Sequence, residues 1–332
     1  MLLETYLTDF LQNLSETFTS PKKRVFIGYL FSGFALGMAW LYWRKKQSLK
    51  ESWQRCFAKE IWWSPSAKAD YQVMLLNKLT FLFLAPLLLT QMAVATWLFQ
   101  TLYEVIGHRP IFGSGWPTGS IPLLFTLCYL LLDDFFRYYL HKLLHEVPVL
   151  WAFHKVHHSA RTMTPLTVFR AHPVEGVLFS LRTAIVQAIS IAGFVFFFGP
   201  QADLVTVWGA SIFAFLFNLT GSNLRHSHVK IAYWPKLEKF LISPAMHQIH
   251  HSTDPKHFDK NYGVILAVWD RMGGTLVHGH ESEGISYGLS RKIKADEQSL
   301  KSLYLVPFKE SASALVKGLS RLKPFKKSQQ KA

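Results

Sequence analysis

The stretch His141-Lys-Leu-Leu-His-Glu-Val-Pro-Val-Leu-Trp-Ala-Phe-His-Lys-Val-His-His158 contains five histidines in 18 residues. An even spread of the chain's 15 histidines over 332 residues would place only roughly 0.8 in a window of this size. Its last five residues follow the pattern HxxHH, and the same pattern returns as His247-Gln-Ile-His-His251. Repetition of one spacing in two places indicates metal ligands rather than a chance cluster of surface residues.

The spacing of the histidines predicts how many ions they hold. His141 and His145 are four residues apart, so on a helix both imidazoles project from one face, about one turn apart. In each HxxHH segment we expect the first and fourth positions to share a helix face and the last histidine to point about 100° away. The pairs expected to share a face are His154 with His157 and His247 with His250, and the histidines expected to point elsewhere are His158 and His251. The duplicated pattern therefore predicts two metal ions.

The residue types limit the kind of metal site. Neutral imidazole suits iron, zinc, copper and nickel, and the affinity order of the first-row metals does not choose among them. The chain has 2 cysteines, Cys56 and Cys128, which stand alone in the sequence. This count excludes thiolate zinc ribbons, cysteine-ligated iron–sulfur clusters and a disulfide framework.

Hydropathy predicts a membrane protein. Half of the residues are hydrophobic, and apolar runs occur at 25–43, 79–99, 121–132, 177–198 and 204–219. The first run is long enough to cross a bilayer, which takes about 20 residues, and basic and aromatic residues typical of membrane interfaces flank it. A re-entrant or tilted helix would also fit this run. We predict an all-α fold, a polytopic integral membrane helical bundle.

The distribution of basic residues predicts the topology. Residues 44–72 contain seven Lys or Arg, whereas residues 100–120 contain only Arg109, so the positive-inside rule places the first loop in the cytosol and the second outside. Residues 79–140 are predicted to form a helical hairpin. Gly199-Pro200 interrupts the next apolar stretch, and the runs 177–198 and 204–219 are predicted to form a second hairpin. Both HxxHH segments then end on the cytosolic side, as a histidine-rich helical cap.

The formal net charge of +15 fits a membrane protein, because cytosolic loops attract Lys and Arg. No motif for nucleic acid accompanies this charge, so no nucleic-acid partner is expected. We divide the chain into a lead-in, first membrane helix and basic connector at 1–72, a membrane-embedded domain at 73–290 with its core at 120–280, and a basic cytosolic tail at 291–332.

An acidic residue shares the predicted ligand face of the helix before the first HxxHH segment. Asp134, His141 and His145 fall on one side of that helix by the helical count. A carboxylate at this place can accept the distal N–H of a histidine and orient the ring. Alternatively, Asp133 or Asp134 pairs with Arg137.

The three histidine segments resemble the histidine boxes of the fatty acid hydroxylase or sterol desaturase superfamily, the membrane-bound di-iron oxygenases. The boxes correspond to HxxxH at 141–145 and HxxHH at 154–158 and 247–251. The resemblance extends to Arg170-Ala-His-Pro-Val-Glu175, Asn261-Tyr-Gly263 and Trp269-Asp-Arg271, and it covers roughly residues 120–280.

The resemblance implies two non-haem iron ions and O2 as co-substrate. His226 is similar to a histidine that the family places ahead of its third box, and His172 is similar to the family's His-Pro histidine, with a helix-capping role as the alternative. His228 stands where an Asn is common in the family, which leaves its role open. The ligands expected from this resemblance are His141, His145, His154, His157, His158, His172, His226, His247, His250 and His251.

Two carboxylates and four further histidines complete the expected site assignment. Asp134 and Asp270 are expected to orient ligand histidines. No other histidine lies at ligand spacing from the remaining four, which are therefore expected on the surface: His108, His257, His278 and His280.

The resemblance implies an enzyme that hydroxylates, or desaturates, a lipid such as a sterol or a fatty acyl chain. The sequence has no phosphate loop and no Gly-rich dinucleotide fingerprint, so electrons are expected from a separate donor such as cytochrome b5 or a ferredoxin with its reductase. The alternative is a non-enzymatic membrane protein that binds or transports a divalent metal. Transporters usually carry Asp or Glu inside their spans, and the apolar runs of this chain are nearly free of carboxylates.

Overall fold

The structure is a computed structural model that describes residues 2–88, 90–107, 112, 115–117, 119–199, 203–207, 210–289 and 296–321. Helices make up most of this part of the chain. Its only strands are β1 (Thr206–Val207) and β2 (Ala210–Ser211), which pair antiparallel. The prediction of a helical fold is confirmed for the described residues.

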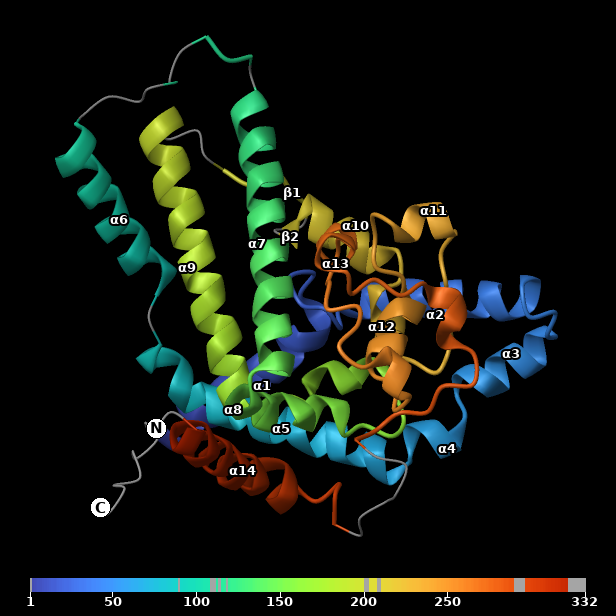
Figure 1. The fold of residues 1–332 in the computed structure, drawn as a ribbon. Coiled ribbons are helices and arrows are strands. Elements are labelled where there is room, and N and C mark those ends of the chain that lie inside the picture. Colours follow the sequence, from blue (N-terminus) through green and yellow to red (C-terminus); the bar gives the residue numbers. More distant parts are fainter. Residues whose placement is uncertain are drawn as a thin grey trace, which may run out of the picture.

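Three long helices form the upper part of the molecule in Figure 1: α6 (Gln91–Ile106), α7 (Ser120–Glu146) and α9 (Pro173–Phe198). We expected residues 79–140 to form a hairpin of two neighbouring helices. Instead α9 lies between α6 and α7 and packs on both (Figure 1). The faces that these helices turn outward are apolar, with exposed Trp97, Leu123, Leu127, Leu131, Ile185 and Ile189.

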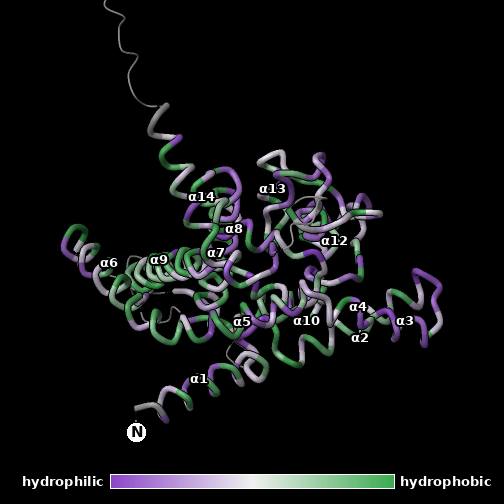
Figure 2. The backbone as a smooth tube through the Cα atoms, turned by 90° about the horizontal axis from the view of Figure 1, so that it is seen from below, coloured by the Kyte–Doolittle hydropathy of each residue, from purple (hydrophilic) through white to green (hydrophobic). Residues whose placement is uncertain are grey.

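By length and composition, two segments could cross a membrane: Pro65–Ile106 and Pro173–Phe198. The first contains a break, because α5 (Pro65–Leu84) ends in the 3-10 turn η1 (Ala85–Leu87) before α6 begins. Figure 1 shows α5 lying across the bottom of the molecule and α6 rising beside α9. Figure 2 shows hydrophobic residues concentrated on α6, α7 and α9 and more hydrophilic ones around α3 and α13.

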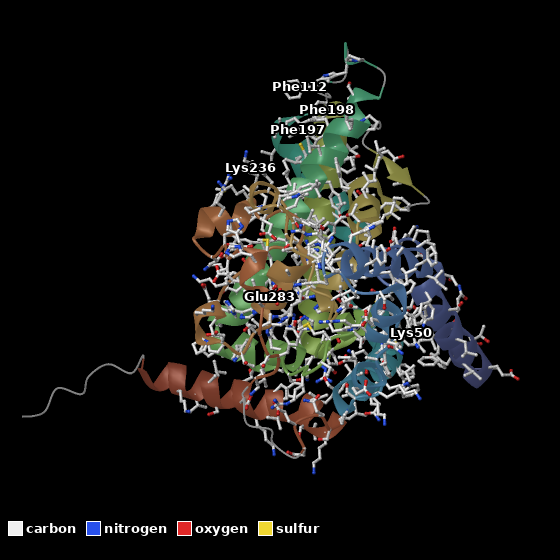
Figure 3. The ribbon with its side chains drawn as sticks, turned by 90° about the vertical axis from the view of Figure 1, so that its right-hand side faces the viewer. Lys50, Phe112, Phe197, Phe198, Lys236 and Glu283 are labelled. Carbon is white, nitrogen blue, oxygen red and sulfur yellow. The ribbon has the colours of Figure 1, made fainter. Side chains whose placement is uncertain are left out.

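Aromatic side chains gather where α7 begins and α9 ends. Phe112 donates its backbone N–H to the carbonyl of Phe197 at 2.9 Å, and its ring lies 5.6 Å from that of Phe198. Figure 3 shows these three residues at the tip of the bundle, with the charged Lys50 and Glu283 far below them and Lys236 nearer to their level. The two ends of the molecule therefore differ in polarity, as a membrane-inserted end and a water-exposed end would.

The predicted hairpin between the runs 177–198 and 204–219 is wrong. After α9 the chain forms β1, β2 and then α10 (Ile212–Leu219), a helix of 8 residues. At about 1.5 Å per residue such a helix covers less than half of a bilayer core of about 30 Å. The β-branched residues Val205, Thr206 and Val207 favour extended backbone at this place, and Val205 N–H donates to the hydroxyl of Thr126 in α7 at 2.9 Å.

Helix α2 (Ile27–Trp43) forms in the first apolar run, but it does not run alongside the three long helices. Figure 1 shows it crosswise to α7, on the right of the molecule near α3, which matches the tilted alternative. Its buried residues are four apart: Tyr29, Gly33, Gly37 and Leu41. Because Leu224 lies within van der Waals contact of the place where a Cβ would stand on either glycine, α2 packs closely against the segment that carries His226.

The lower part of the molecule contains α8 (Pro148–His158), α5 and α14 (Leu300–Arg321). We expected a tail after residue 291, but residues 300–321 form a helix that packs on α8 and α5. Leu303 is buried against Val73 and Val156, and the hydroxyl of Tyr304 donates to Asn77 Oδ1 at 2.7 Å. The apolar side of this basic segment is thus part of the folded body.

Shorter elements fill the remainder of the described chain. The α-helices are α1 (Leu2–Thr19), α3 (Leu49–Cys56), α4 (Lys59–Trp62), α11 (Pro235–Glu238), α12 (Pro244–His250) and α13 (Val268–Gly273). The 3-10 helices are η2 (Pro165–Phe169), η3 (Ser222–His226), η4 (Pro255–His257) and η5 (Gly279–Ser282). Of these, α12 and η3 face α8 and carry histidines toward it.

Candidate metal centre

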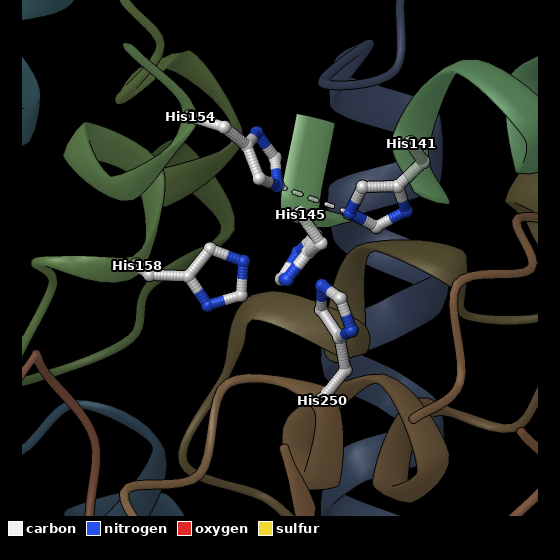
Figure 4. Close-up of side chains that lie close together, drawn as sticks. All are labelled: His141, His145, His154, His158 and His250. Carbon is white, nitrogen blue, oxygen red and sulfur yellow. Dashed lines mark hydrogen bonds between the residues drawn. The ribbon is translucent and has the colours of Figure 1, made fainter. Parts of the chain in front are cut away.

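Four elements bring nine histidines together below the long helices: α7, α8, η3 and α12 with the residue that caps it. They form two groups whose ligand atoms lie within 4.8 Å of one another. The five-histidine group consists of His141, His145, His154, His158 and His250, and Figure 4 shows its rings turned toward a common centre. The four-histidine group consists of His157, His226, His247 and His251.

The structure divides each HxxHH segment differently from the prediction. In α8, His154 and His158 belong to the five-histidine group and His157 belongs to the four-histidine group. The second segment exchanges these roles, with His247 and His251 in the four-histidine group and His250 in the other. The predicted i, i+3 pairing is wrong because residues four apart are separated by only about 40° around a helix, against about 60° for residues three apart. Each segment consequently contributes to both groups.

Backbone carbonyls orient three of the rings. Nδ1 lies 2.8 Å from the Tyr262 carbonyl in His141, 3.1 Å from the Arg170 carbonyl in His157, and 2.7 Å from the Lys260 carbonyl in His250. Because a carbonyl only accepts, Nδ1 donates in each case, and a neutral ring then presents the lone pair of Nε2 to the site.

The Nε2 atoms lie close together, and some of them are left without a hydrogen-bond partner. In the five-histidine group, Nε2 of His141 lies 3.1 Å from Nε2 of His154 (Figure 4). In the other group, Nε2 of His226 lies 3.2 Å from that of His157 and 3.0 Å from that of His247. Three further Nε2 atoms are buried without a hydrogen-bond partner, those of His145, His158 and His250. Buried nitrogens without partners at the centre of a cluster are what a metal ion would satisfy.

The histidines are neutral at physiological pH, as ligands must be. Burial is the main cause: it lowers the pKa of His141 to about 4, and burial with the nearby His141 lowers the pKa of His157 to about 3. The pKa of His226 lies well below its usual value for the same reason, with added repulsion from His157, Arg225 and Arg24. Nine imidazole nitrogens without thiolate therefore fit two first-row transition metal ions.

Two histidines whose role the sequence left open lie outside both groups. Nδ1 of His172 accepts the N–H of Val174 at 3.1 Å and so caps α9, while its Nε2 lies 3.2 Å from the Tyr304 carbonyl. Both ring nitrogens are engaged, which corrects the expectation of a ligand in favour of the helix-capping alternative. Nε2 of His228 lies 2.6 Å from the Arg55 carbonyl, away from the groups.

The two carboxylates expected beside ligand histidines contact other groups. Asp134 accepts from the N–H groups of Ile265 and Leu266 at 2.9 Å each and from Trp269 Nε1. Asp270 accepts from the N–H groups of Tyr262 and Gly263 and from the Thr275 hydroxyl. Neither touches an imidazole in the described structure, so the expectation is corrected: they fix the loop whose Tyr262 carbonyl accepts from His141. The alternative partner of Arg137 is Asp133, at 2.7 Å.

Glu175 is the carboxylate that sequence reasoning missed. Its Oε1 lies 3.2 Å from Nδ1 of His154, and both side chains are buried. Glu175 stands in the first turn of α9, three residues after His172. An acidic residue next to the His-Pro pair, ahead of an apolar run without another carboxylate, is the signal that could have identified it.

The histidines expected on the surface differ in their exposure. His280 is exposed, and His278 is half-buried with Nδ1 3.1 Å from Glu238 Oε2. His257 is buried, which corrects the expectation, and its Nδ1 lies 3.0 Å from the Ser252 hydroxyl. His108 lies outside the described residues.

A cavity of about 310 Å³ adjoins both groups of histidines. Its wall includes ring atoms of both groups, apolar side chains such as Val168, Phe179 and Val264, and four arginines: Arg24, Arg137, Arg182 and Arg225. A second cavity, of about 320 Å³, lies on the other side of the five-histidine group, between His145 and Asp259. Molecules can therefore approach the ligand nitrogens from two sides.

Residues 126–275 match the model of the fatty acid hydroxylase family. This segment belongs to that family. It contains all nine clustered histidines and the loop around Tyr262, so the family resemblance noted from the three boxes is confirmed. No solved structure matches the chain.

Two kinds of curated relative match about half of this chain. The alkylglycerol monooxygenase of Danio rerio is 34% identical over 164 residues, which are 48% of this chain and 32% of that protein. The alkylglycerol monooxygenase of Homo sapiens is 31% identical over 49% of this chain and 33% of its own length. The lathosterol oxidase of Mus musculus is 31% identical over 56% of this chain and 54% of its own length. The chain thus spans about a third to a half of the curated relatives it matches.

Proposed function

We propose that this protein is a membrane oxygenase that hydroxylates, or less readily desaturates, a lipid with O2 at two non-haem iron ions. The observation that carries this proposal is the convergence of nine buried, neutral imidazoles into two adjacent groups beside one cavity. The relatives named as a monooxygenase and an oxidase support the same class of reaction.

The protein's own residues would hold and shape this centre. The five-histidine and the four-histidine group would each bind one ion, and the carbonyls of Tyr262, Arg170 and Lys260 would keep the Nε2 lone pairs directed at them. When bound, the two irons supply the redox chemistry with O2 that oxidation of an unactivated C–H bond needs. The apolar part of the cavity wall would hold the reacting carbon in place and exclude water.

We further propose that the protein crosses the membrane several times and exposes its metal centre to the cytosol. The three long helices with apolar outer faces would be the membrane part, and α8, α12 and η3 the cytosolic part. The basic loop at 44–72 lies on the side of the histidines and favours the cytosol for that side. A separate donor, such as cytochrome b5 or a ferredoxin with its reductase, would deliver electrons there.

A divalent-metal transporter remains the rival class. Transporters bind their ion at the middle of the membrane between discontinuous helices. Here the ligands come from the last turns of α7 and from short helices beyond it, and the orienting contacts of three rings hold them in fixed positions. A rigid, end-of-helix site favours the oxygenase.

The proposal is tested by comparing lipid extracts of cells with and without the gene by mass spectrometry. An oxygenase adds about 16 mass units to one lipid class by hydroxylation, or removes about 2 by desaturation, and cells expressing a His247→Ala variant lack this product. Identical lipid profiles, together with altered cellular zinc or iron content, would favour the transporter instead.

A further inference from the structure

Four arginine side chains line the cavity beside the histidine groups, and they come from four separate parts of the chain. Arg24 precedes α2, Arg137 and Arg182 lie in α7 and α9, and Arg225 lies in η3 next to His226. Sequence positions so far apart meet here because α7 packs on α9 while α2 packs on η3. Within the described structure, these guanidinium groups make no hydrogen bond to the ligand atoms of the histidines and do not orient the rings. Their positive charge helps to lower the pKa of nearby rings such as that of His226.

Negative charge in the cavity balances only part of this positive charge. Asp133 accepts from both Arg137 and Arg182, at 2.7 Å each. Glu175, which lies in the cavity wall itself, is placed against His154 rather than against an arginine. Within the described residues, the remaining two arginines, Arg24 and Arg225, therefore have no carboxylate partner.

These two arginines differ in how they are held. Arg225 is buried, and it donates through Nε to the Ser222 carbonyl and through Nη1 to the Val264 carbonyl. Both acceptors are neutral, so they fix the guanidinium without cancelling its charge. Arg24 makes no hydrogen bond or ion pair with any residue that the structure describes. Burial, with Arg137 and Arg225 as the next causes, lowers its pKa to about 9.

A cation kept among other cations is unfavourable unless an anion joins it. Guanidinium groups bind carboxylates and phosphates through paired hydrogen bonds, and they do so more strongly where water is excluded. Bound metal ions would add further positive charge to the same cavity. The geometry of this cavity thus suits a ligand with one anionic end.

A neighbouring cavity offers a place for an apolar end. It has a volume of about 440 Å³ and shares Val168 and Ala171 with the wall of the first cavity. Its other lining residues include Met74, Phe81 and Leu82 of α5. A hydrocarbon chain entering between α5 and α9 would reach the histidine groups past Ala171.

We propose that the arginine-lined cavity binds the anionic head, a carboxylate or a phosphate, of an amphiphilic substrate through Arg24 and Arg225. The apolar chain of this substrate occupies the neighbouring cavity, and the carbon to be oxidised lies between the two, beside the histidines. Calling this ligand a substrate rests on the proposed oxygenase function. Binding of the ligand to the two cavities does not require turnover.

The test is a calorimetric titration of the full-length, metal-loaded protein in a non-ionic detergent. The probes are octyl phosphate, octanoate and the neutral octanol, which share one chain length. We expect the better of the two anions to bind at least about tenfold more tightly than octanol, as expected when a charged hydrogen bond of about 1.4 kcal/mol is gained. Preference for octyl phosphate identifies a phosphate head, and preference for octanoate identifies a carboxylate.

Arg24→Gln is the decisive variant, because Arg24 has no hydrogen-bond or ion-pair partner in the described structure. Its replacement therefore leaves no carboxylate or carbonyl without a partner. We expect it to abolish the preference for anions while metal content and melting temperature stay unchanged. Arg44→Gln, at the exposed far end of α2, is the matched control and keeps the preference. Equal binding of all three probes by the wild type, or an unchanged preference in Arg24→Gln, overturns the proposal. Because this experiment measures binding and not turnover, its failure would not contradict the proposed oxygenase function.

Discussion

Nε2 of His157 lies 3.2 Å from Nε2 of His226, although 69 positions separate the two residues in the chain. The contact forms because the carbonyl of Arg170 fixes the ring of His157 from behind, while α2 packs against the η3 segment that carries His226. Three separate pieces of the fold thus determine the geometry of one pair of ligand atoms. The variants below probe how far the two groups of histidines depend on one another and on their supports.

Metal content should follow the two-group arrangement. Protein made in iron-supplied cells is expected to contain close to two metal ions per chain by elemental analysis. His247→Ala in the four-histidine group and His145→Ala in the five-histidine group should each lower this number and abolish lipid oxidation. His280→Ala, at an exposed histidine, is the control and should change neither. Correctly folded wild-type protein with one ion or none would contradict the two-ion assignment.

Glu175→Gln should loosen the five-histidine group without unfolding the protein. The substitution keeps the size of the side chain but replaces the carboxyl group beside Nδ1 of His154 with an amide. Loss of such a supporting carboxylate typically lowers metal affinity about 10–100-fold, measurable by competition with a coloured chelator. Glu281→Gln, at an exposed acidic residue, serves as the control. Unchanged affinity in Glu175→Gln would show that the carboxylate does not support the site.

Gly263→Ala should damage the site through the backbone. A Cβ at this position would lie 2.7 Å from Asp270 Oδ2 and 2.8 Å from the Leu266 carbonyl, so the loop that presents the Tyr262 carbonyl to His141 must move. We expect a loss of stability of about 1–3 kcal/mol from the overpacking, seen as a lower melting temperature, and weaker metal binding. Gly193→Ala, where nothing lies within 4 Å of the added Cβ, should have little effect.

Acid should destabilise the metal-free protein. The pKa of His141 falls from 6.5 to about 4 on folding, and that of His157 from 6.5 to about 3. At a pH between the folded and the unfolded pKa of each ring, the unfolded chain binds more protons than the folded one. The free energy of unfolding therefore decreases as the pH falls below 6.5. The melting temperature of chelator-treated protein should therefore drop between pH 8 and pH 5. A double variant with Asn at both positions should drop less, and a melting temperature that rises on acidification would disagree with the burial of these rings.

Cysteine labelling tests the proposed topology. Ser159 and Ser252, which follow the two HxxHH segments, are buried and would react poorly from either side. The exposed residues Lys239 and Glu281 on the histidine side and Glu104 near the far end of α6 are better positions. In a chain with Cys56 and Cys128 replaced by Ser, cysteines at the first two positions should react only from the cytosol, and one at Glu104 only from outside. Labelling of all three from one side would refute the membrane crossing between them.

The sequence alone predicted the histidines of the centre, because ligand residues must repeat at helical spacing and imidazole is rare enough to stand out. HxxxH and the two HxxHH segments contributed eight of the nine clustered residues, and the resemblance to the family added His226. Local rules also predicted two of the long apolar helices correctly, since α7 and α9 contain the runs 121–132 and 177–198, whereas the run 79–99 is divided between α5, η1 and α6.

Tertiary structure decided which histidines act together and what supports them. A helix fixes the angle between neighbouring residues. The position of the partner helix, however, determines whether His157 or His158 joins His154 in the five-histidine group. In the same way, the packing of α9 places the carboxyl group of Glu175 next to His154, and the packing of α2 places Arg24 beside the histidines. The capping role of His172 depends on the start of α9 and on the Tyr304 carbonyl of α14. Such contacts join residues far apart in the chain, and no local spacing encodes them, because their energy exists only once the helices have packed.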